Sequence, residues 1–211
     1  MVAVPIICPH YPDITVRGSK NTFATGVEYV TSLTTSGSRN TLSSPRKVSS
    51  GGSPMRWNIA DYRPGGSQSV NAGTNYHEIL ASSCLGGIWS VNAKNIPSGV
   101  VYVPCAIQIS GSKSTINATI VAEGSIKLNG SGIIFGRGLP GVPAFLTAAI
   151  GENALRVDGS DIQIRGTVQA LGGHARITGA KGIYRCGIIA KTIEISGAKN
   201  SVVVDDACSS Q

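Results

Sequence analysis

The sequence has few charged and few aromatic residues for its length. Charged residues make up 14% of the 211 positions and aromatic residues 5%, against about 25% charged residues in an average globular protein. A helical bundle, which is rich in Leu, Glu, Lys and Ala, is therefore not expected. Hydrophobic residues still account for 41% of the chain, which is enough to bury a core and excludes global disorder. The 27 glycines are typical of short strands and tight turns.

Long hydrophobic runs are also missing. The longest candidate, residues 132–151, is interrupted by Arg137, Pro140 and Pro143, so no membrane-spanning segment is predicted. The first residues, MVAVPIICPHYP, place no basic residue before their apolar stretch and have a proline at position 5, unlike a signal peptide. We therefore expect either a cytoplasmic protein or one whose leader or anchor is not part of this sequence.

The sequence lacks the spacings that metal sites and nucleophilic catalysis require. The five cysteines include no Cys-x-x-Cys pair, and none stands at ligand spacing from a histidine, so no metal site is predicted. No Gly-x-Ser-x-Gly motif is present, and no Cys or Ser stands in a recognisable setting with His. We predict no catalytic residues and no cofactor.

One short phrase recurs along the chain and is the main structural signal. An alternating stretch of Ile, Leu or Val is followed by a glycine and a small residue, as in Ile107-Gln-Ile109-Ser-Gly111. The alternation predicts a strand with one buried face, and the glycine predicts a corner. The glycines of the seven phrases are Gly18, Gly37, Gly111, Gly130, Gly159, Gly179 and Gly197.

Most of these glycines lie about 18 to 20 residues apart, and a unit of this length cannot bury its own apolar face. Each unit must therefore stack on its neighbours, at the strand spacing of about 4.8 Å. The sequence predicts an all-β fold, a single-stranded right-handed parallel β-helix (a solenoid) with rungs of about 18–20 residues. A β-sandwich, a propeller and a hexapeptide helix fit the repeat less well. One interior column is expected to contain Ile109, Leu128, Val157, Ile177 and Ile195.

The expected domain organisation follows the repeat. Residues 1–12 form an N-terminal extension, residues 13–206 form the β-helix domain, and residues 207–211 form a tail. A non-repeating insert at about residues 45–100 contains both tryptophans, and we expect it to cap a side or an end of the solenoid. The alternative is a ligand cleft lined by Trp57, Tyr62, Trp89 and His77.

The wording of the repeat resembles that of a family of bacterial cell-surface domains. The matching stretches are AIQISGSKSTINATIVAEGS at residues 106–125, the phrase at 193–200, Asp-Tyr-Arg-Pro-Gly-Gly-Ser at 61–67 and Ala-Gly-Thr-Asn-Tyr-His at 72–77. They are similar to the extracellular β-helix portions of proteins linked to tight-adherence (Tad-type) pilus assembly. The resemblance implies a non-catalytic structural role in the cell envelope or outside the cell. A more distant resemblance is to bactofilins, which are cytosolic β-helix polymers.

Three functions remain open. The first is a non-catalytic structural protein of the cell surface, a pilus or a matrix, which presents a rigid rod for adhesion or assembly. The second is an extracellular filament whose subunits stack end to end by β-augmentation. The third is a β-helix enzyme acting on acidic polysaccharides, with candidate acids Asp158 and Asp161 beside Arg156 and Arg165, or the pair Asp205 and Asp206.

The first two functions predict that the partners are other envelope or pilus proteins, or further copies of the chain. The expected localisation is extracellular or in the cell envelope, with the cytoplasm as the alternative.

Positive charge collects at one position of the repeat. The residue two places after the corner glycine is basic in five phrases, and Gly132 and Asp161 take its place in the other two. Equivalent positions stack in a solenoid, so these basic residues, in a chain with a net charge of +7, form a candidate column for binding an acidic glycan or another polyanion. The alternative is a solvated edge that prevents aggregation, and no specific recognition of nucleic acid is predicted. The column comprises Lys20, Arg39, Lys113, Lys181 and Lys199.

The cysteines are expected to form disulfide bonds only if the protein is exported. Cys84 and Cys105 flank the return of the insert to the repeat, and are a candidate disulfide. Cys186 is expected to be a small buried hydrophobic residue. Cys8 and Cys208 lie near the termini and are candidates for a link to each other or between subunits.

Asn and Thr follow the basic position in several phrases (Asn21, Asn40 and Asn200). We expect these residues to form internal hydrogen-bond ladders at the corners rather than an ice-binding or carbohydrate-binding array.

Overall fold

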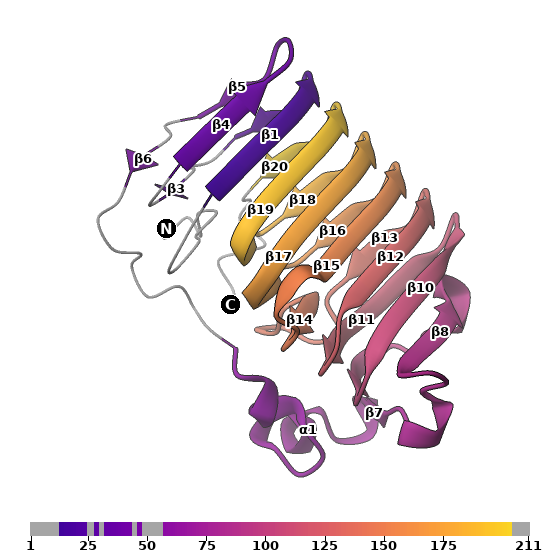
Figure 1. The fold of residues 1–211 in the computed structure, drawn as a ribbon. Helices are drawn as coiled ribbons and strands as arrows, with labels where there is room; N and C mark the ends of the chain where they lie inside the picture. Colours follow the sequence, from indigo (N-terminus) through magenta and orange to yellow (C-terminus); the bar gives the residue numbers. More distant parts are fainter. Residues whose placement is uncertain (1–12, 25–27, 30–31, 44–45, 48–56, 204–211) are drawn as a thin grey trace.

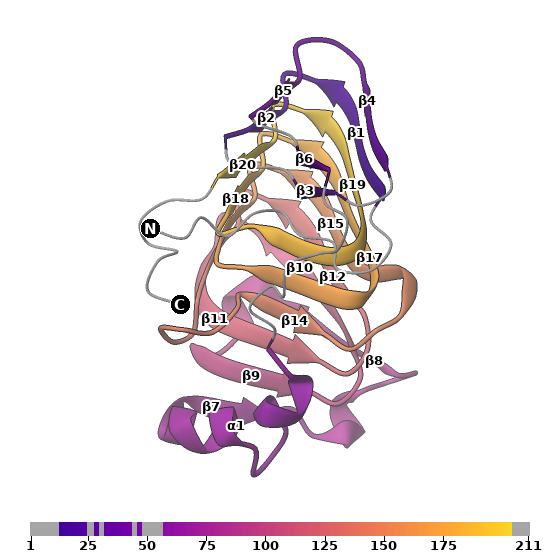
Figure 2. The ribbon, with the colours of Figure 1, turned by 90° about the vertical axis from the view of Figure 1, so that its left-hand side faces the viewer.

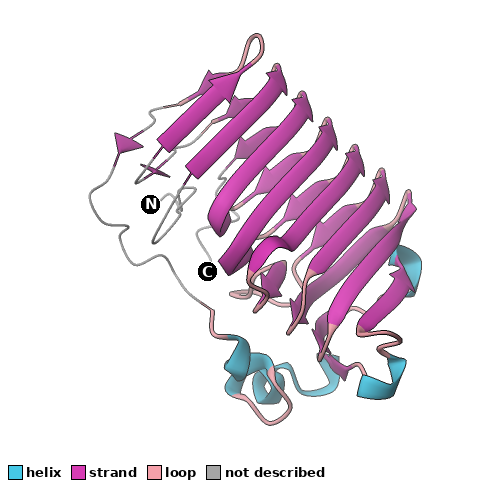
Figure 3. Cartoon of the chain, viewed as in Figure 1, coloured by secondary structure: helices cyan, strands magenta, loops and turns pink. Residues whose placement is uncertain are grey.

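The computed structural model of the chain describes residues 13–24, 28–29, 32–43, 46–47 and 57–203. Within these residues the chain is mostly strand, with short helices between residues 59 and 95 (Figure 3). The predictions made for residues 1–12 and 207–211, for Cys8 and Cys208, and for Asp205 and Asp206 fall outside the described residues.

The strands form one continuous parallel coil in which each turn of the chain lies on a neighbouring turn (Figure 1). The coil is right-handed, and its strands form three faces around a packed interior (Figure 2). The predicted parallel β-helix is therefore confirmed. The first face contains, in spatial order, β8 (Ile88–Asn92), β10 (Ala106–Ser112), β12 (Ile126–Ser131), β15 (Gly151–Ser160), β17 (Val168–Ala180), β19 (Ile188–Ala198), β1 (Asp13–Ser19) and β4 (Ser32–Ser36).

The other two faces are built from shorter strands and from bends in the long ones. The second face contains β11 (Thr115–Ala122), β13 (Ile134–Gly136), β16 (Gln163–Arg165), β18 (Ile183–Arg185), β20 (Ser201–Val203), β2 (Thr22–Phe23) and β5 (Thr41–Leu42). The third face contains β7 (Tyr76–Glu78), β9 (Gly99–Val103), the end of β11, β14 (Phe145–Thr147) and the beginnings of β17 and β19.

The interior consists of aliphatic columns. The predicted column is present: Ile109, Leu128, Val157, Ile177 and Ile195 lie in register on neighbouring strands, and each is at most 1% exposed. Burial of one such side chain stabilises a fold by about 1.5–3 kcal/mol, so stacking provides the burial that no single rung achieves.

The N-terminal strands stack at the far end of the coil. β1 pairs with β19, which places Ile14 beside Ile193 and Gly18 beside Gly197, and β4 lies on β1. The first two repeat phrases therefore follow the last phrase in space, at the end opposite β8, where Figure 1 shows indigo strands beside yellow β19. The order of the phrases in the sequence did not indicate this arrangement.

The corner glycines are needed because neighbouring backbones come very close. A Cβ atom at Gly179 would lie 1.7 Å from the carbonyl oxygen of Gly159, and φ of Gly179 is +147°. No other residue fits there, since real Cβ atoms do not approach an oxygen so closely.

The insert at residues 45–100 is not a single unit. Its described part begins with η1 (Ile59–Tyr62), α1 (Ser67–Ala72) and η2 (Gly73–Asn75). Residues of η1 and α1 pack on the side of the coil in one cluster with Val100, Tyr102 and Val121. The later part contains β7, η3 (Ala81–Ser83), β8 and η4 (Ala93–Asn95), and its two strands are rungs of the coil.

The two tryptophans of the insert lie in different places. Trp57 packs in the side cluster with Tyr62, whereas Trp89 packs against the main core. Trp57, Tyr62, Trp89 and His77 therefore do not line one cleft, and that alternative was wrong. None of the helices in the described part of the chain has both the length and the apolar character needed to cross a bilayer.

Candidate polyanion-binding ridge

The five basic residues of the predicted column share one unusual backbone conformation. Their φ angles lie between 47° and 61°, and all five side chains are exposed. For a residue with a Cβ atom the left-handed conformation costs about 1–2 kcal/mol, and Gly or Asn adopts it more readily. The chain therefore places long cations at positions where a smaller residue is conformationally favoured.

Backbone hydrogen bonds hold these turns in register. The N–H of Lys181 donates to Ala198 O at 2.9 Å, that of Lys199 to Ser19 O at 3.0 Å, and that of Lys20 to Ser38 O at 2.9 Å. These bonds connect consecutive rungs, and the bond from Lys199 crosses the junction between the C-terminal and N-terminal strands. The turns are thus stacked at about the 4.8 Å spacing of paired strands.

Stacking changes the order of the five cations from that in the sequence. The spatial order is Lys113, Gly132, Asp161, Lys181, Lys199, Lys20, Arg39. Four cations thus stand on four neighbouring rungs, while Lys113 is separated from them by Gly132 and Asp161. We call Lys181, Lys199, Lys20 and Arg39 the basic ridge.

The repulsion between neighbouring cations of the basic ridge is modest. Two like charges at this spacing repel by about 1 kcal/mol in water, and salt reduces the repulsion. At one end of the ridge, Lys181 Nζ lies 3.9 Å from Asp161 Oδ1, with both side chains more than half exposed, a geometry in which ion pairs are weak. The ridge therefore presents a row of exposed positive charges that Asp161 offsets at one end.

A second row of cations on the first face was not predicted. Lys127, Arg156 and Arg176 lie beside one another on β12, β15 and β17. Arg156 Nε contacts Asp158 Oδ2 at 2.6 Å, and Arg176 Nε lies 3.5 Å from Glu194 Oε2. Neighbouring carboxylates offset part of the positive charge of this row, so it is a weaker candidate for polyanion binding than the basic ridge. The sequence feature that could have indicated this row is the basic residue three places before the corner glycine in three phrases.

The candidate acids of the enzyme hypothesis have different surroundings. Asp158 accepts hydrogen bonds from Arg156 and from the Thr178 hydroxyl, whereas Asp161 stands at the turn beside Lys181. Arg165 Nη2 donates a 3.5 Å hydrogen bond to Gln163. The structure therefore does not bring these residues into one cluster of carboxylates.

A buried amide ladder lies beneath the basic ridge. The Nδ2 group of Asn21 donates to Asn40 Oδ1 at 3.1 Å and to Gly197 O at 3.2 Å, and Asn200 Nδ2 donates to Gly179 O at 3.1 Å. Asn21 is 0% and Asn200 2% exposed. These asparagines satisfy corner backbone groups from inside, as expected.

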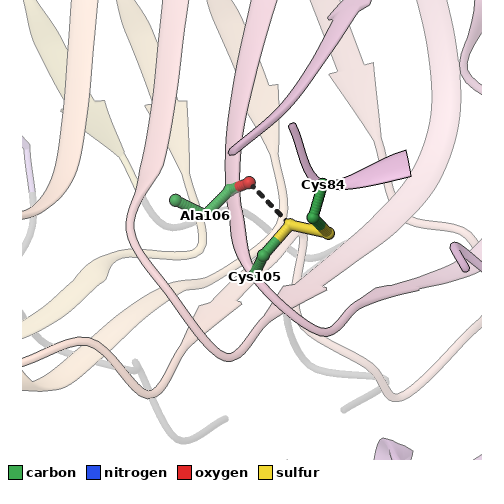
Figure 4. Close-up of a disulfide and its surroundings, with 3 residues drawn as sticks. All are labelled: Cys84, Cys105 and Ala106. Atoms are coloured by element: carbon green, nitrogen blue, oxygen red, sulfur yellow. Dashed lines mark hydrogen bonds between the residues drawn. A yellow bond between two sulfur atoms is a disulfide. The ribbon is translucent and has the colours of Figure 1, made fainter. Parts of the chain in front are cut away.

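Three cysteines of the described residues are disulfide-bonded. Cys84 and Cys105, the candidate pair, are bonded, with their Cα atoms 6.3 Å apart (Figure 4). The bond joins the segment before β8 to the segment before β10. Cys186 is 2% exposed, but it is disulfide-bonded rather than merely a small hydrophobic residue.

A polar cluster fastens the helical part of the insert to the coil. Arg63 contacts Glu123 through two bonds of 2.6 and 3.1 Å, and the Tyr102 hydroxyl donates to Glu123 at 2.9 Å. The hydrogen bonds from Arg63 lower the pKa of Glu123, and Glu123 raises the pKa of Arg63. Burial raises the pKa values of Tyr62 and Tyr102.

Two of the surface hollows lie among the described residues and have different linings. A groove of about 390 Å³ lies beside β1, β15 and β17 and mixes acidic with basic side chains, among them Asp13, Arg17 and Glu152. A second hollow of about 370 Å³ is lined by Trp57 and Gln169 among others. Within the described residues, no group of three or more His, Cys, Asp or Glu side chains is placed to hold a metal ion.

Comparison of the chain with protein-family models, with curated proteins and with solved structures gives no match.

Proposed function

We propose that this protein is a non-catalytic structural rod of the bacterial cell surface or of an extracellular matrix. The observation that carries the proposal is the unbroken stacking of rungs from β8 to β4. Each interior rung is hydrogen-bonded along its length to two neighbours, which makes such a solenoid stiff. The engagement of Asp158 by Arg156 and Thr178 also supports a structural use of this candidate acid.

The disulfides support an extracytoplasmic location. Cys84–Cys105 closes a segment with a sequence separation of 21 residues, and Cys186 is bonded as well. Such bonds persist in oxidising compartments and are rare in the cytoplasm. The resemblance of the repeat to Tad-associated surface domains agrees with this location, and pilus or envelope proteins are the proposed partners.

Labelling of bacteria that produce the protein tests this role. An antibody against the solenoid should label intact cells as strongly as lysed cells, and the extracted protein should migrate differently after reduction. Labelling that appears only after lysis would contradict the surface location. Degradation of an acidic polysaccharide by the pure protein, abolished in Asp158→Asn, would contradict the non-catalytic role.

The basic ridge supports a second function, the binding of a linear acidic glycan. Four cations occupy neighbouring rungs, and each is kept in a conformation that costs a residue with a Cβ atom about 1–2 kcal/mol. A rod with such an edge suits a polymer that carries regularly spaced carboxylates. Binding of polygalacturonate that weakens steeply with added salt is the test of this role.

A further inference from the structure

The N-terminal strands form a small unit that is joined to the rest of the coil at one end face. Three pairings lie within the unit: β1 with β4, β2 with β5, and β3 (Glu28–Tyr29) with β6 (Arg46–Lys47). Among the described strands, only β1–β19 and β2–β20 connect the unit to the remainder. We call residues 13–47 the N-terminal unit and residues 57–203 the body.

The end face of the body fits the unit as one rung fits the next. A Cβ atom at Gly18 would lie 1.9 Å from Gly197 O, and one at Gly197 would lie 1.8 Å from Gly179 O. Ile14 and Val16 extend the interior columns and are 0% exposed. The contact is therefore an ordinary rung-to-rung contact and depends on stacking, not on chain connectivity.

Backbone hydrogen bonds complete this contact. The N–H of Thr22 donates to Asn200 O at 2.8 Å, and that of Ala24 donates to Val202 O at 3.1 Å. Without the unit, β19 and β20 would present an open edge, and such edges pair with other chains. The end of the body is thus an acceptor, and the N-terminal unit is the segment that fits it.

We propose that the N-terminal unit is exchanged between copies of this chain, so that the unit of one copy stacks on β19 and β20 of a second copy. The same hydrogen bonds and columns form in the exchanged and unexchanged arrangements, and the concentration of the chain decides between them. In the sequence, nine residues (VSSGGSPMR) separate Lys47 from Trp57, so one short connection of the chain joins the unit to the body.

Exchange has a consequence for assembly. Each copy carries one donor unit and one acceptor face, so two copies that exchange units reciprocally form a closed pair, and exchange that is not reciprocal propagates into an open chain of copies. Completion of one subunit by a segment of the next is a known mode of strand addition. This inference rests on the proposed structural function, because it names a second copy of the chain as the assembly partner of the rod.

Cysteines placed across the contact test the exchange. Ser19 and Ala198 are direct partners on β1 and β19. The single variants Ser19→Cys and Ala198→Cys, with different tags, are produced together in one cell and oxidised. Exchange predicts a disulfide-linked product that contains both tags, and linked products of two or more chains for the double variant. Ala198→Cys combined with Ser90→Cys, on β8 at the opposite end, is the control and should give no product with both tags.

Two results would overturn the exchange. One is a double variant that is linked only within single chains, with no product that contains both tags. The other is that wild-type protein, refolded over a range of concentrations, is monomeric by light scattering at each of them. Neither result affects the surface labelling of intact cells, so failure of the exchange is distinguishable from failure of the proposed structural function.

Discussion

The backbone N–H of Asn200 donates a 3.0 Å hydrogen bond to Oδ1 of Asn21, a residue 179 positions earlier in the chain. The relation continues on both sides, since the N–H of Asn21 donates to Oδ1 of Asn40 and the N–H of Gly182 donates to Oδ1 of Asn200. One buried amide column therefore crosses the junction between the body and the N-terminal unit. The unit is held by buried polar bonds as well as by apolar packing.

Replacement of Asn21 should weaken this junction. Asn21→Ala leaves the buried N–H of Asn200 without its acceptor, which costs about 1–3 kcal/mol. The free energy of unfolding, measured by urea titration, should fall by this amount. Asn129→Ala is the matched control, because Asn129 is exposed on the outer face and surface changes stay within about 0.5 kcal/mol. Equal losses in the two variants would contradict a special role for the column.

Closeness of the backbones at the corners gives a second prediction. Gly179→Ala places a Cβ atom 1.7 Å from Gly159 O, so neighbouring rungs must separate. The loss of stability should exceed about 4 kcal/mol, beyond the range of most substitutions, and circular dichroism should show lost strand content. Gly151→Ala is the control, because Gly151 also has positive φ but meets no atom within 4 Å. It should lose only about 1–2 kcal/mol, and a similar loss for Gly179→Ala would be inconsistent with a steric cause.

Much of the fold could be predicted from the sequence because stacked rungs repeat one physical solution. The alternation around Ile109 and Ile195 identifies the buried face, and the glycine after it identifies the corner. Both are local requirements that each phrase shows by itself. The amide ladder of Asn21 was predictable for the same reason, since a buried corner needs polar groups that satisfy its backbone.

The order of the rungs could not be predicted from the sequence. The phrases at Ile14 and Ile193 are nearly interchangeable, so the residues do not state which phrase stacks on which. The neighbouring positions of Lys199 and Lys20 in the basic ridge depend on that order, so they could not be predicted either. Trp57 and Trp89 belong to the same insert, but the helical segment and the turn of the coil between them place them in different clusters.

The attachment of the helical part of the insert should depend on pH. Arg63 lowers the pKa of Glu123 in the folded protein, below the value of about 4.3 for an unperturbed Glu. The stabilisation from this pair is therefore fully present above the unfolded pKa and is lost as pH falls through the folded pKa. Unfolding midpoints between pH 6 and pH 3, followed by Trp57 fluorescence in a Trp89→Phe background, should show the loss.

The control for this pH dependence is Glu123→Gln, which cannot titrate at position 123. Its midpoint should be lower than that of the parent at pH 6, and the difference between the two proteins should shrink toward pH 3. A difference that stays constant over this range would show that Glu123 is not responsible.

Binding of an acidic glycan should depend on the contiguous cations and not on net charge alone. Lys199 and Lys20 stand on neighbouring rungs inside the basic ridge, whereas Lys113 is separated from it by Gly132 and Asp161. A partly screened surface contact contributes about 0.5–1 kcal/mol, so Lys199→Gln should weaken polygalacturonate binding by about 2–5-fold at low salt. Lys199→Gln with Lys20→Gln should lose more and also show a flatter salt dependence.

Lys113→Gln is the matched control for this ridge, because it removes the same charge from the same kind of left-handed turn. It should bind polygalacturonate nearly as well as the parent, and both variants should keep the parent circular dichroism. An equal loss for Lys113→Gln and Lys199→Gln would mean that the overall charge of +7, and not the ridge, attracts the polymer. Equally tight binding of double-stranded DNA would widen the ligand class from acidic glycans to polyanions in general, because phosphate contacts are insensitive to sequence.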